Sequence, residues 1–226
     1  MPISPHALWI AVKNFLSSPF DSQAYWEKRY AYGKHSGAGS RGKLAEFKAT
    51  VLNEFVAKNQ IGTVIEYGCG DGYQLSLANY PQYIGFDVSI TAVQACRKLF
   101  ANDATKSFKE MRDYGGETAD LALSLDVIYH LIEDDAYEAY MDRLFSSANR
   151  FVVIYSSNCE SLNRVEPKHI KHRRLSMWIR DHATDWKLID HIPNTYPYTG
   201  VNDEGSFSDF YSTNNVPISN EELAYH

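Results

Sequence analysis

The sequence predicts an α/β domain whose helices pack on both faces of a doubly wound, mostly parallel β-sheet. Two short apolar runs, at 63–65 and 83–86, suit strands that are buried on both faces, and each gives way to an acidic residue. Stretches with apolar residues at helical spacing alternate with such runs along the chain. Near the end, runs at 186–192 and 206–211 are separated by a loop, which predicts an antiparallel edge on the parallel sheet.

Length and composition bound the possible classes of protein. The 226 residues, 44% of them hydrophobic, are enough for one sizeable core, so we expect a single domain with added segments. The expected divisions are an N-terminal helical segment at 1–42, a central domain at 43–212 and a polar tail at 213–226. A formal net charge of −6 disfavours general binding to nucleic acid, which requires an excess of Lys and Arg.

The cysteines and the N-terminus bear on the cellular compartment. Three cysteines, Cys69, Cys96 and Cys159, lie far apart and cannot all pair, which indicates a reducing compartment and no structural zinc. The apolar stretch at 7–16 is too short for a membrane span and lacks the basic flank and cleavage site of a signal peptide. We therefore expect a cytoplasmic, soluble protein with no membrane partner and no metal.

The residues at 63–75, TVIEYGCGDGYQL, form the centre of the predicted site. The strand breaks at Glu66, and glycines two apart follow it at Gly68, Gly70 and Gly72. Glycine adopts positive φ at low cost and lets the backbone approach a ligand, and a helix starting near Asp71 would point free N–H groups at the same place. The spacing G-x-G-x-G differs from the G-x-G-x-x-G of dinucleotide-binding folds, which disfavours a nicotinamide-dependent oxidoreductase.

The pattern Glu66-x-Gly68-x-Gly70-x-Gly72 resembles the first motif of class I S-adenosylmethionine-dependent methyltransferases, in which an acid precedes the glycines. A second apolar strand ends at Asp87, where a nucleoside-binding βαβ unit places an acid on the ribose hydroxyls. The resemblance implies a Rossmann-like sheet of seven strands, with the seventh inserted antiparallel between the fifth and sixth, and S-adenosyl-L-methionine as cofactor. The cofactor contacts that it implies are Glu66, Gly68, Gly70, Gly72, Asp87, Val88, Leu125 and Asp126.

The N-terminal segment is expected to hold a short helix within 1–20 and a second helical stretch at 21–30. In that stretch Tyr25, Arg29 and neighbouring aromatic residues can share one helical face. The face either packs on the core or forms a lid over the cofactor, where Tyr25 or Arg29 would hold the methionine carboxylate. A loop at 33–40, rich in Gly and Ser, either moves or cradles a ligand.

Helical spacing of apolar residues predicts a helix at 43–59, before the glycine strand, and another at 91–100 with Ser89 as its N-cap. A third helix follows the acids at 133–135, which favour the positive end of a helix dipole. A further helix is expected to begin near Leu175. The basic residues expected on its outer side are Arg173, Arg174 and Arg180.

The third, fourth and fifth strands complete the predicted parallel part of the sheet. A short strand is expected at 104–111, and in the family an acid after this strand meets the adenine amino group; both Glu110 and Asp113 qualify. The fourth strand leads to Asp126, where the family's chain passes the transferable methyl group. Enzymes that methylate exocyclic amino groups of DNA bases carry Pro-Pro after this position, and no proline follows here, which disfavours such an acceptor. The fifth strand is expected at 151–155.

The segment at 168–174 stands out in this acidic chain because six of its seven residues are basic or imidazole. This segment is interpreted in one of two ways. It is either a solvated charged surface, or it binds an anionic acceptor or supplies the catalytic base. A metal site using His169 and His172 would need further ligands that the sequence does not place nearby. A nucleic-acid patch would need a broader basic surround.

Methyl transfer to a hydroxyl group requires removal of its proton, for which histidine is suited. The histidines considered as the base are His130, His169 and His172. The chain is similar to small methyltransferases of bacterial surface-polysaccharide and natural-product pathways, which implies O-methylation of a small hydroxylated or phosphorylated acceptor, such as an anionic sugar or sugar nucleotide. The alternatives are a relative that binds S-adenosylmethionine or S-adenosylhomocysteine without catalysis, and a protein methyltransferase.

Overall fold

The computed structural model describes residues 20–162, 166–199 and 205–216. The helix expected before residue 20 and the tail expected beyond residue 216 lie outside these ranges. The α-helices are α2 (Ser22–Ala31), α3 (Gly42–Lys58), α4 (Ile90–Leu99), α5 (Asp134–Ser146) and α6 (Leu175–His182). The strands are β1 (Thr63–Tyr67), β2 (Gln82–Asp87), β3 (Lys106–Glu110), β4 (Ala119–Leu125), β5 (Ala148–Ser156), β6 (Trp186–Ile192) and β7 (Asp209–Asn215).

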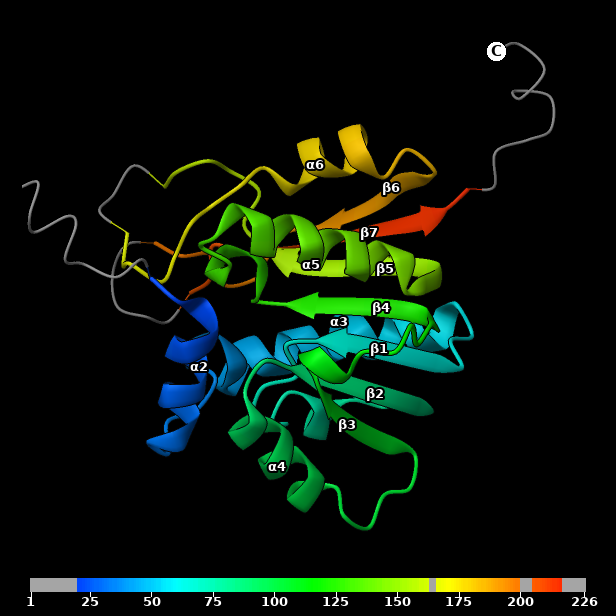
Figure 1. Ribbon diagram of the computed structural model, residues 1–226. Helices are drawn as coiled ribbons and strands as arrows, with labels where there is room; N and C mark the ends of the chain where they lie inside the picture. The colour runs from blue at the N-terminus through cyan, green and yellow to red at the C-terminus, as the bar shows by residue number, and fades with distance from the viewer. Residues whose placement is uncertain (1–19, 163–165, 200–204, 217–226) are drawn as a thin grey trace, which may run out of the picture.

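In the described part of the chain, seven strands form one sheet in the order β3-β2-β1-β4-β5-β7-β6. The strands β1 to β5 pair in parallel, whereas β7 runs antiparallel to both β5 and β6. In Figure 1 the arrowheads of β4 and β5 point toward α2, and the arrowhead of β7 points away from it. The predicted fold class is confirmed, including the insertion of the seventh strand between the fifth and the sixth.

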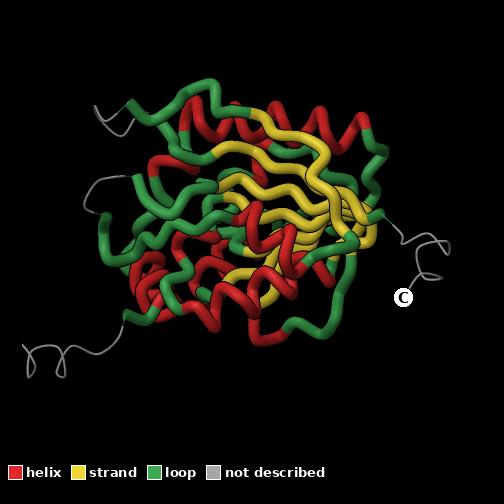
Figure 2. The backbone as a smooth tube through the Cα atoms, turned by 90° about the horizontal axis from the view of Figure 1, so that it is seen from above, coloured by secondary structure: helices red, strands yellow, loops and turns green. Residues whose placement is uncertain are grey.

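Helices cover the two faces of the sheet and divide the core into two clusters, because successive side chains of a strand point to opposite faces. On one face, Val64 of β1 packs in a cluster with residues of α3 and α4. On the other face, Ile65 packs in a cluster with residues of α5 and α6. Figure 2 shows the red helices on both sides of the yellow strands. None of the helices described is long and apolar enough to cross a membrane.

The predicted helix starts are confirmed where a local signal exists. The Ser89 hydroxyl accepts a hydrogen bond from the backbone N–H of Ala92 at 3.1 Å, so Ser89 is the N-cap of α4. The acids Asp134 and Asp135 occupy the first turn of α5. The helix α3 begins one residue before the predicted boundary and also ends one residue before it.

The helix expected near Asp71 is not formed, and this prediction was wrong. A turn follows the glycines instead, and then the short 3-10 helix η2 (Leu75–Leu77). Gly70 and Gly72 have φ of 58° and 78°, which an α-helix cannot include. The Asp71 carboxylate accepts a hydrogen bond from the N–H of Tyr73 at 3.2 Å and so stabilises the turn.

Two further predictions near the C-terminus need correction. Arg173 does not face outward, because it precedes α6 and turns back onto α5, with its guanidinium 4.4 Å from the ring centroid of Tyr137. It also donates a hydrogen bond to the carbonyl oxygen of Leu131 at 2.6 Å. The last strand begins at Asp209 and ends at Asn215, later than the expected 206–211, because the ladders with β5 and β6 together pair these residues.

Candidate active site

A cavity of about 610 Å³ lies at the carboxyl ends of the parallel strands, which is where ligands bind in open α/β sheets. Its wall includes residues that end or follow four strands: Glu66, Asp87, Met111 and Asp126. The helix α2 closes the other side of the cavity, and Figure 1 shows it beyond the arrowheads of the strands. The volume is in the range of sites for small molecules and cofactors.

In the glycine loop after β1, the backbone lies so close to neighbouring side chains that two of its glycines leave no room for a Cβ atom. Gly68 has φ of 84°, and a Cβ atom there would lie 2.4 Å from Cγ2 of Val127. A Cβ atom at Gly70 would lie 2.5 Å from the Ser36 hydroxyl oxygen. Both glycines line the cavity, whereas Gly72 lies outside its lining and packs against Cys96 of α4. Two of the three glycines of the motif therefore line the cavity, and the third allows close packing against α4.

Asp87 is held by the backbone at the end of β2. Its carboxylate accepts hydrogen bonds from the N–H groups of Gly70 and Ser89, both at 2.9 Å. Burial raises the pKa of Asp87 to about 6. Burial also raises the pKa of Glu66 to about 7, although this carboxyl group accepts a hydrogen bond from the Tyr83 hydroxyl at 2.6 Å. Val88 and Leu125, which were also predicted as cofactor contacts, line the same cavity.

The helix α2 docks on the N-termini of two other helices. Glu27 accepts hydrogen bonds from the hydroxyls of Ser89 and Thr91 at the start of α4, and these bonds lower the pKa of Glu27. Near the other end of α2, the N–H of Ser22 donates to Glu133, which precedes α5, at 3.0 Å. The side chains of Trp26 and Tyr30 line the cavity between these two anchors.

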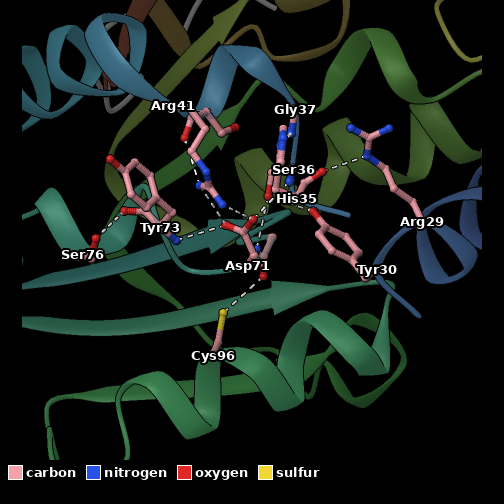
Figure 3. Close-up of polar contacts among 12 residues, drawn as sticks. Arg29, Tyr30, His35, Ser36, Gly37, Arg41, Asp71, Tyr73, Ser76 and Cys96 are labelled. Atoms are coloured by element: carbon pink, nitrogen blue, oxygen red, sulfur yellow. Dashed lines mark hydrogen bonds and ion pairs between the residues drawn. The ribbon is translucent and has the colours of Figure 1, made fainter. Parts of the chain in front are cut away.

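The loop after α2 is tied to the glycine loop through Asp71, as Figure 3 shows. The N–H of Ser36 donates to the Asp71 carboxylate at 3.1 Å, and the N–H of Asp71 donates back to the Ser36 hydroxyl at 3.2 Å. Arg41 donates to the same carboxylate at 2.6 Å. Arg29 points elsewhere, to the carbonyl oxygen of His35 at 2.9 Å, and lies outside the cavity lining. We call α2 and residues 32–41 the lid segment.

Asp126, directly after β4, is held by side chains from three other segments. Its Oδ2 is 2.7 Å from Nζ of Lys48 in α3, and its Oδ1 accepts hydrogen bonds from the hydroxyls of Tyr129 at 2.9 Å and Ser208 at 3.1 Å. Lys48 is only 1% exposed. We call Lys48, Asp126, Tyr129 and Ser208 the Asp126 cluster. Sequence reasoning missed Lys48, because its position in α3 looks like any other basic residue of an amphipathic helix.

The three histidines fall into two environments. His130 and His169 line the cavity, with ring centroids 5.5 Å apart and the planes stacked. The His130 Nδ1 atom is 2.8 Å from the carbonyl oxygen of His169, and burial lowers the pKa of His130 to about 4. His172 is buried outside the lining, with its Nδ1 2.7 Å from the hydroxyl of Ser157. Tyr25 also lies outside the lining, but its ring stacks on His169 at 5.0 Å.

The charges around the cavity are predominantly negative. In the described ranges, its lining holds one lysine, Lys48, and the six acids Asp21, Glu66, Asp71, Asp87, Asp126 and Glu133. Two cations of the segment at 168–174 pair with an acid outside the lining. Lys171 and Arg173 contact Asp134 at 2.6 and 2.7 Å. Neither Glu110 nor Asp113 is in the lining.

Within the ranges that the structure describes, no three His, Cys, Asp or Glu side chains are grouped so that they could hold a metal ion.

The residues present fit S-adenosylmethionine. The acid-rich wall suits a cationic sulfonium and ammonium, and the buried Asp87 at the end of β2 is placed as the resemblance implies for a ribose. Together with the inserted antiparallel strand, these features define the chain as a class I S-adenosylmethionine-dependent methyltransferase. A family model described as a methyltransferase domain matches residues 40–195, and the chain belongs to this family.

Solved structures share the fold at low sequence identity. The N-methyltransferase NodS from Bradyrhizobium japonicum WM9, in complex with S-adenosyl-L-homocysteine, has a TM-score of 0.68 at 14% identity, covering 87% of this chain and 99% of NodS. Magnesium protoporphyrin IX methyltransferase ChlM from Synechocystis PCC 6803 has a TM-score of 0.62 at 14% identity, covering 88% and 99%. A putative O-methyltransferase from Klebsiella pneumoniae has a TM-score of 0.56 at 10% identity, covering 93% and 96%. A search of curated proteins finds no match.

Proposed function

We propose that this methyltransferase transfers the methyl group of S-adenosylmethionine to a hydroxyl group of a small, neutral, sugar-like acceptor. The observation that carries the proposal is the state of His130, a neutral histidine in the wall of the same cavity as Asp87. S-Adenosylmethionine supplies a methyl group that is already activated as a sulfonium. What the protein has to add is the position of the acceptor oxygen and the removal of its proton.

His130 lies in the cavity wall and can accept that proton on a ring nitrogen. The carbonyl oxygen of His169 can only accept a hydrogen bond, so Nδ1 of His130 carries the hydrogen and Nε2 keeps its lone pair. With a pKa of about 4, the ring is unprotonated at neutral pH. In the transfer, the carbon–sulfur bond breaks as the carbon–oxygen bond forms, and the proton of the acceptor hydroxyl moves to Nε2 of His130.

Charge and shape support a neutral acceptor more than an anionic one. A phosphate would meet the six acids of the lining, whereas the cations of the segment at 168–174 that contact Asp134 are already paired outside the cavity. The aromatic rings of Trp26, Tyr129 and Phe207 line the same cavity and offer flat surfaces to a ring-shaped acceptor.

The lid segment, which is part of the N-terminal segment expected at 1–42, is proposed to cover the cofactor site of the central domain. Support comes from the docking of α2 on α4 and α5 and from the exchange of hydrogen bonds between Ser36 and Asp71. In this proposal Tyr25 acts through His169, on which it stacks. Arg41 pairs with Asp71 next to the glycine loop, but its side chain, like that of Arg29, lies outside the cavity lining.

The test is methyl transfer to matched acceptors. Methyl β-D-glucopyranoside, D-glucosamine and glucose 6-phosphate are each incubated with S-adenosylmethionine, and the products are identified by mass spectrometry. We expect methylation of the neutral glucoside and no methylation of the phosphate ester. A product from the phosphate ester alone would contradict the proposed acceptor class.

The same assay tests the base. His130→Gln is expected to lower kcat by roughly 10² or more, the usual contribution of a general base, with unchanged affinity for S-adenosylhomocysteine. His172→Gln is the matched control from outside the cavity. A larger loss of turnover for His172→Gln than for His130→Gln would reverse the assignment.

N-Methylation of an amine is a second candidate, and the excess of acids over lysine in the lining favours it, because an ammonium group is attracted to carboxylates. D-Glucosamine separates the two reactions, since its methylated product carries the new group either on nitrogen or on oxygen. Fragmentation of the product assigns the position.

A further inference from the structure

The Asp126 cluster contains a largely buried ion pair that links α3 to the end of β4. Lys48 comes from the middle of α3, 78 residues before Asp126, and its ammonium group lies 2.7 Å from the carboxylate. The lysine side chain is almost completely buried, at 1% exposure. Removing two such charges from water is costly, and a pair of apolar residues of similar size often stabilises a fold as well or better.

Asp126 is also held in an unusual backbone conformation. Its φ of 59° is in the left-handed region, which non-glycine residues seldom adopt and which Asp and Asn tolerate best. Such residues concentrate at functional sites, where the surrounding contacts fix them. Here the contacts come from Tyr129, from Ser208 just before β7, and from Lys48.

We propose that Lys48 is a positioning residue that fixes the Asp126 carboxylate as the docking point for a hydrogen-bond donor of the methyl acceptor, a hydroxyl or amine next to the group that is methylated. This inference rests on the proposed function and names the acceptor chemistry of the same cavity: a neutral ring with two adjacent polar groups. One group docks on Asp126 and its neighbour receives the methyl group.

The geometry of the carboxylate supports this role. Oδ1 already accepts from two hydroxyls, so its lone pairs are used, whereas Oδ2 accepts from Lys48 and keeps capacity for one more donor. Near Oδ2 the lid segment presents Gly39, where a Cβ atom would lie 3.3 Å from this oxygen. The loop therefore approaches Oδ2 without a side chain.

The walls beside the carboxylate suit the body of the acceptor. The Tyr129 ring contacts the Phe207 ring edge to face, with centroids 4.9 Å apart, and contacts His130 at 4.5 Å. All three residues line the cavity together with Asp126. A ring lying on these groups would have its polar edge near both Asp126 and His130.

The inference is tested by binding rather than by turnover. Catechol and methyl β-D-glucopyranoside, an aromatic and an aliphatic ring with adjacent hydroxyls, are titrated by ligand-observed NMR into full-length protein saturated with S-adenosylhomocysteine. D-Glucosamine serves as the amine probe. The variants are Lys48→Met, Asp126→Asn and the double variant, and Lys58→Met on the exposed end of α3 is the matched control.

We expect Asp126→Asn and Lys48→Met to weaken the best-bound probe at least about tenfold, the effect of losing a hydrogen bond to a charged group, and by a larger factor than they change the affinity for S-adenosylhomocysteine. Lys58→Met should match the wild type. If a single variant fails to fold because one buried charge loses its partner, the double variant removes both charges and gives the same readout.

Equal probe binding by the wild type and the double variant would overturn the inference, and so would the absence of probe binding to the wild type at millimolar concentration. Failure of the proposed function is a different result. In that case the wild type binds a probe through Asp126, but no methylated product forms when S-adenosylmethionine replaces S-adenosylhomocysteine.

Discussion

The two ends of the cavity hold their carboxylates in different ways. Asp87 is held by backbone N–H groups of Gly70 and Ser89, whose positions follow from the main chain of the glycine loop and α4. Asp126 is held by side chains of Lys48, Tyr129 and Ser208, which come from separate segments. A carboxylate held by backbone N–H groups keeps its partners when neighbouring side chains are substituted. A carboxylate held by side chains loses a partner whenever one of those side chains is replaced.

This difference separates what the fold provides from what an individual enzyme adds. The end around Asp87 needs only a strand, a glycine turn and a capped helix, and any sequence that forms these builds a similar site. The end around Asp126 needs a particular lysine, tyrosine and serine, so it can change without loss of the fold. Substitutions at one end should therefore leave the other end largely unchanged.

The largest effect is expected at the glycine loop. Gly68→Ala should reduce the free energy of unfolding by roughly 2 to 4 kcal/mol, because alanine is strained at positive φ and its Cβ would collide with Val127. Gly33→Ala is the control, since Gly33 also has positive φ but open space around it. Urea denaturation of both variants measures the difference. Equal losses would mean that the contact with Val127 relaxes freely.

Asp87→Ala should weaken binding of S-adenosylmethionine by about 1.5 to 3 kcal/mol, the contribution of hydrogen bonds to a charged group. Isothermal titration calorimetry measures the change, with the exposed Asp142→Ala on α5 as the control. Because the cavity ends are held separately, binding of the sugar probes should change little. If Asp87→Ala binds the cofactor as tightly as the wild type, Asp87 does not contact the cofactor.

The pH dependence of stability should reveal the buried acid behind the glycine loop. Burial raises the pKa of Glu66 from an ordinary 4.5 to about 7, so the folded protein binds this proton more tightly than the unfolded chain. The free energy of unfolding of the cofactor-free protein should therefore fall as pH rises from about 4.5 through 7, by up to about 3 kcal/mol.

Glu66→Gln is neutral throughout and should make this part of the profile less steep, leaving the contribution of Asp87, whose pKa is raised to about 6, while the Gln amide oxygen can still accept from Tyr83. Urea denaturation at about pH 5 and about pH 8 is sufficient to compare the two proteins. A variant profile as steep as that of the wild type would assign the pH dependence to other groups.

The smallest effect is expected for Lys171→Ala. This lysine pairs with the exposed Asp134 on the surface, and such pairs contribute little to stability. Turnover, acceptor KM and melting temperature should all match the wild type. A raised KM for the acceptor would mean that the segment at 168–174 contributes to acceptor binding. The acceptor site would then not depend on the Asp126 end of the cavity alone.

The features that could be predicted from the sequence are those encoded by residues close together in the chain. The glycine turn after β1, Asp87 at the end of β2 and Ser89 as the N-cap of α4 are local patterns, and the structure forms each of them, although Gly72 lies outside the cavity lining. Sequence reasoning could not reach Lys48, because the burial of that lysine depends on a carboxylate 78 residues away. It also placed a helix at Asp71, where the positive φ of the flanking glycines prevents one. Figure 3 shows the turn that forms instead.

The position of β7 has a consequence for how the chain folds. β6 is made first but has no neighbour in the sheet until β7 arrives, because β7 separates it from β5. β6 can therefore join the sheet only together with β7 or after it, and the pairing of β7 with β5 brings together residues that lie far apart in the chain. Ser208 directly precedes β7, so the Asp126 cluster is completed only when the last strand has been added.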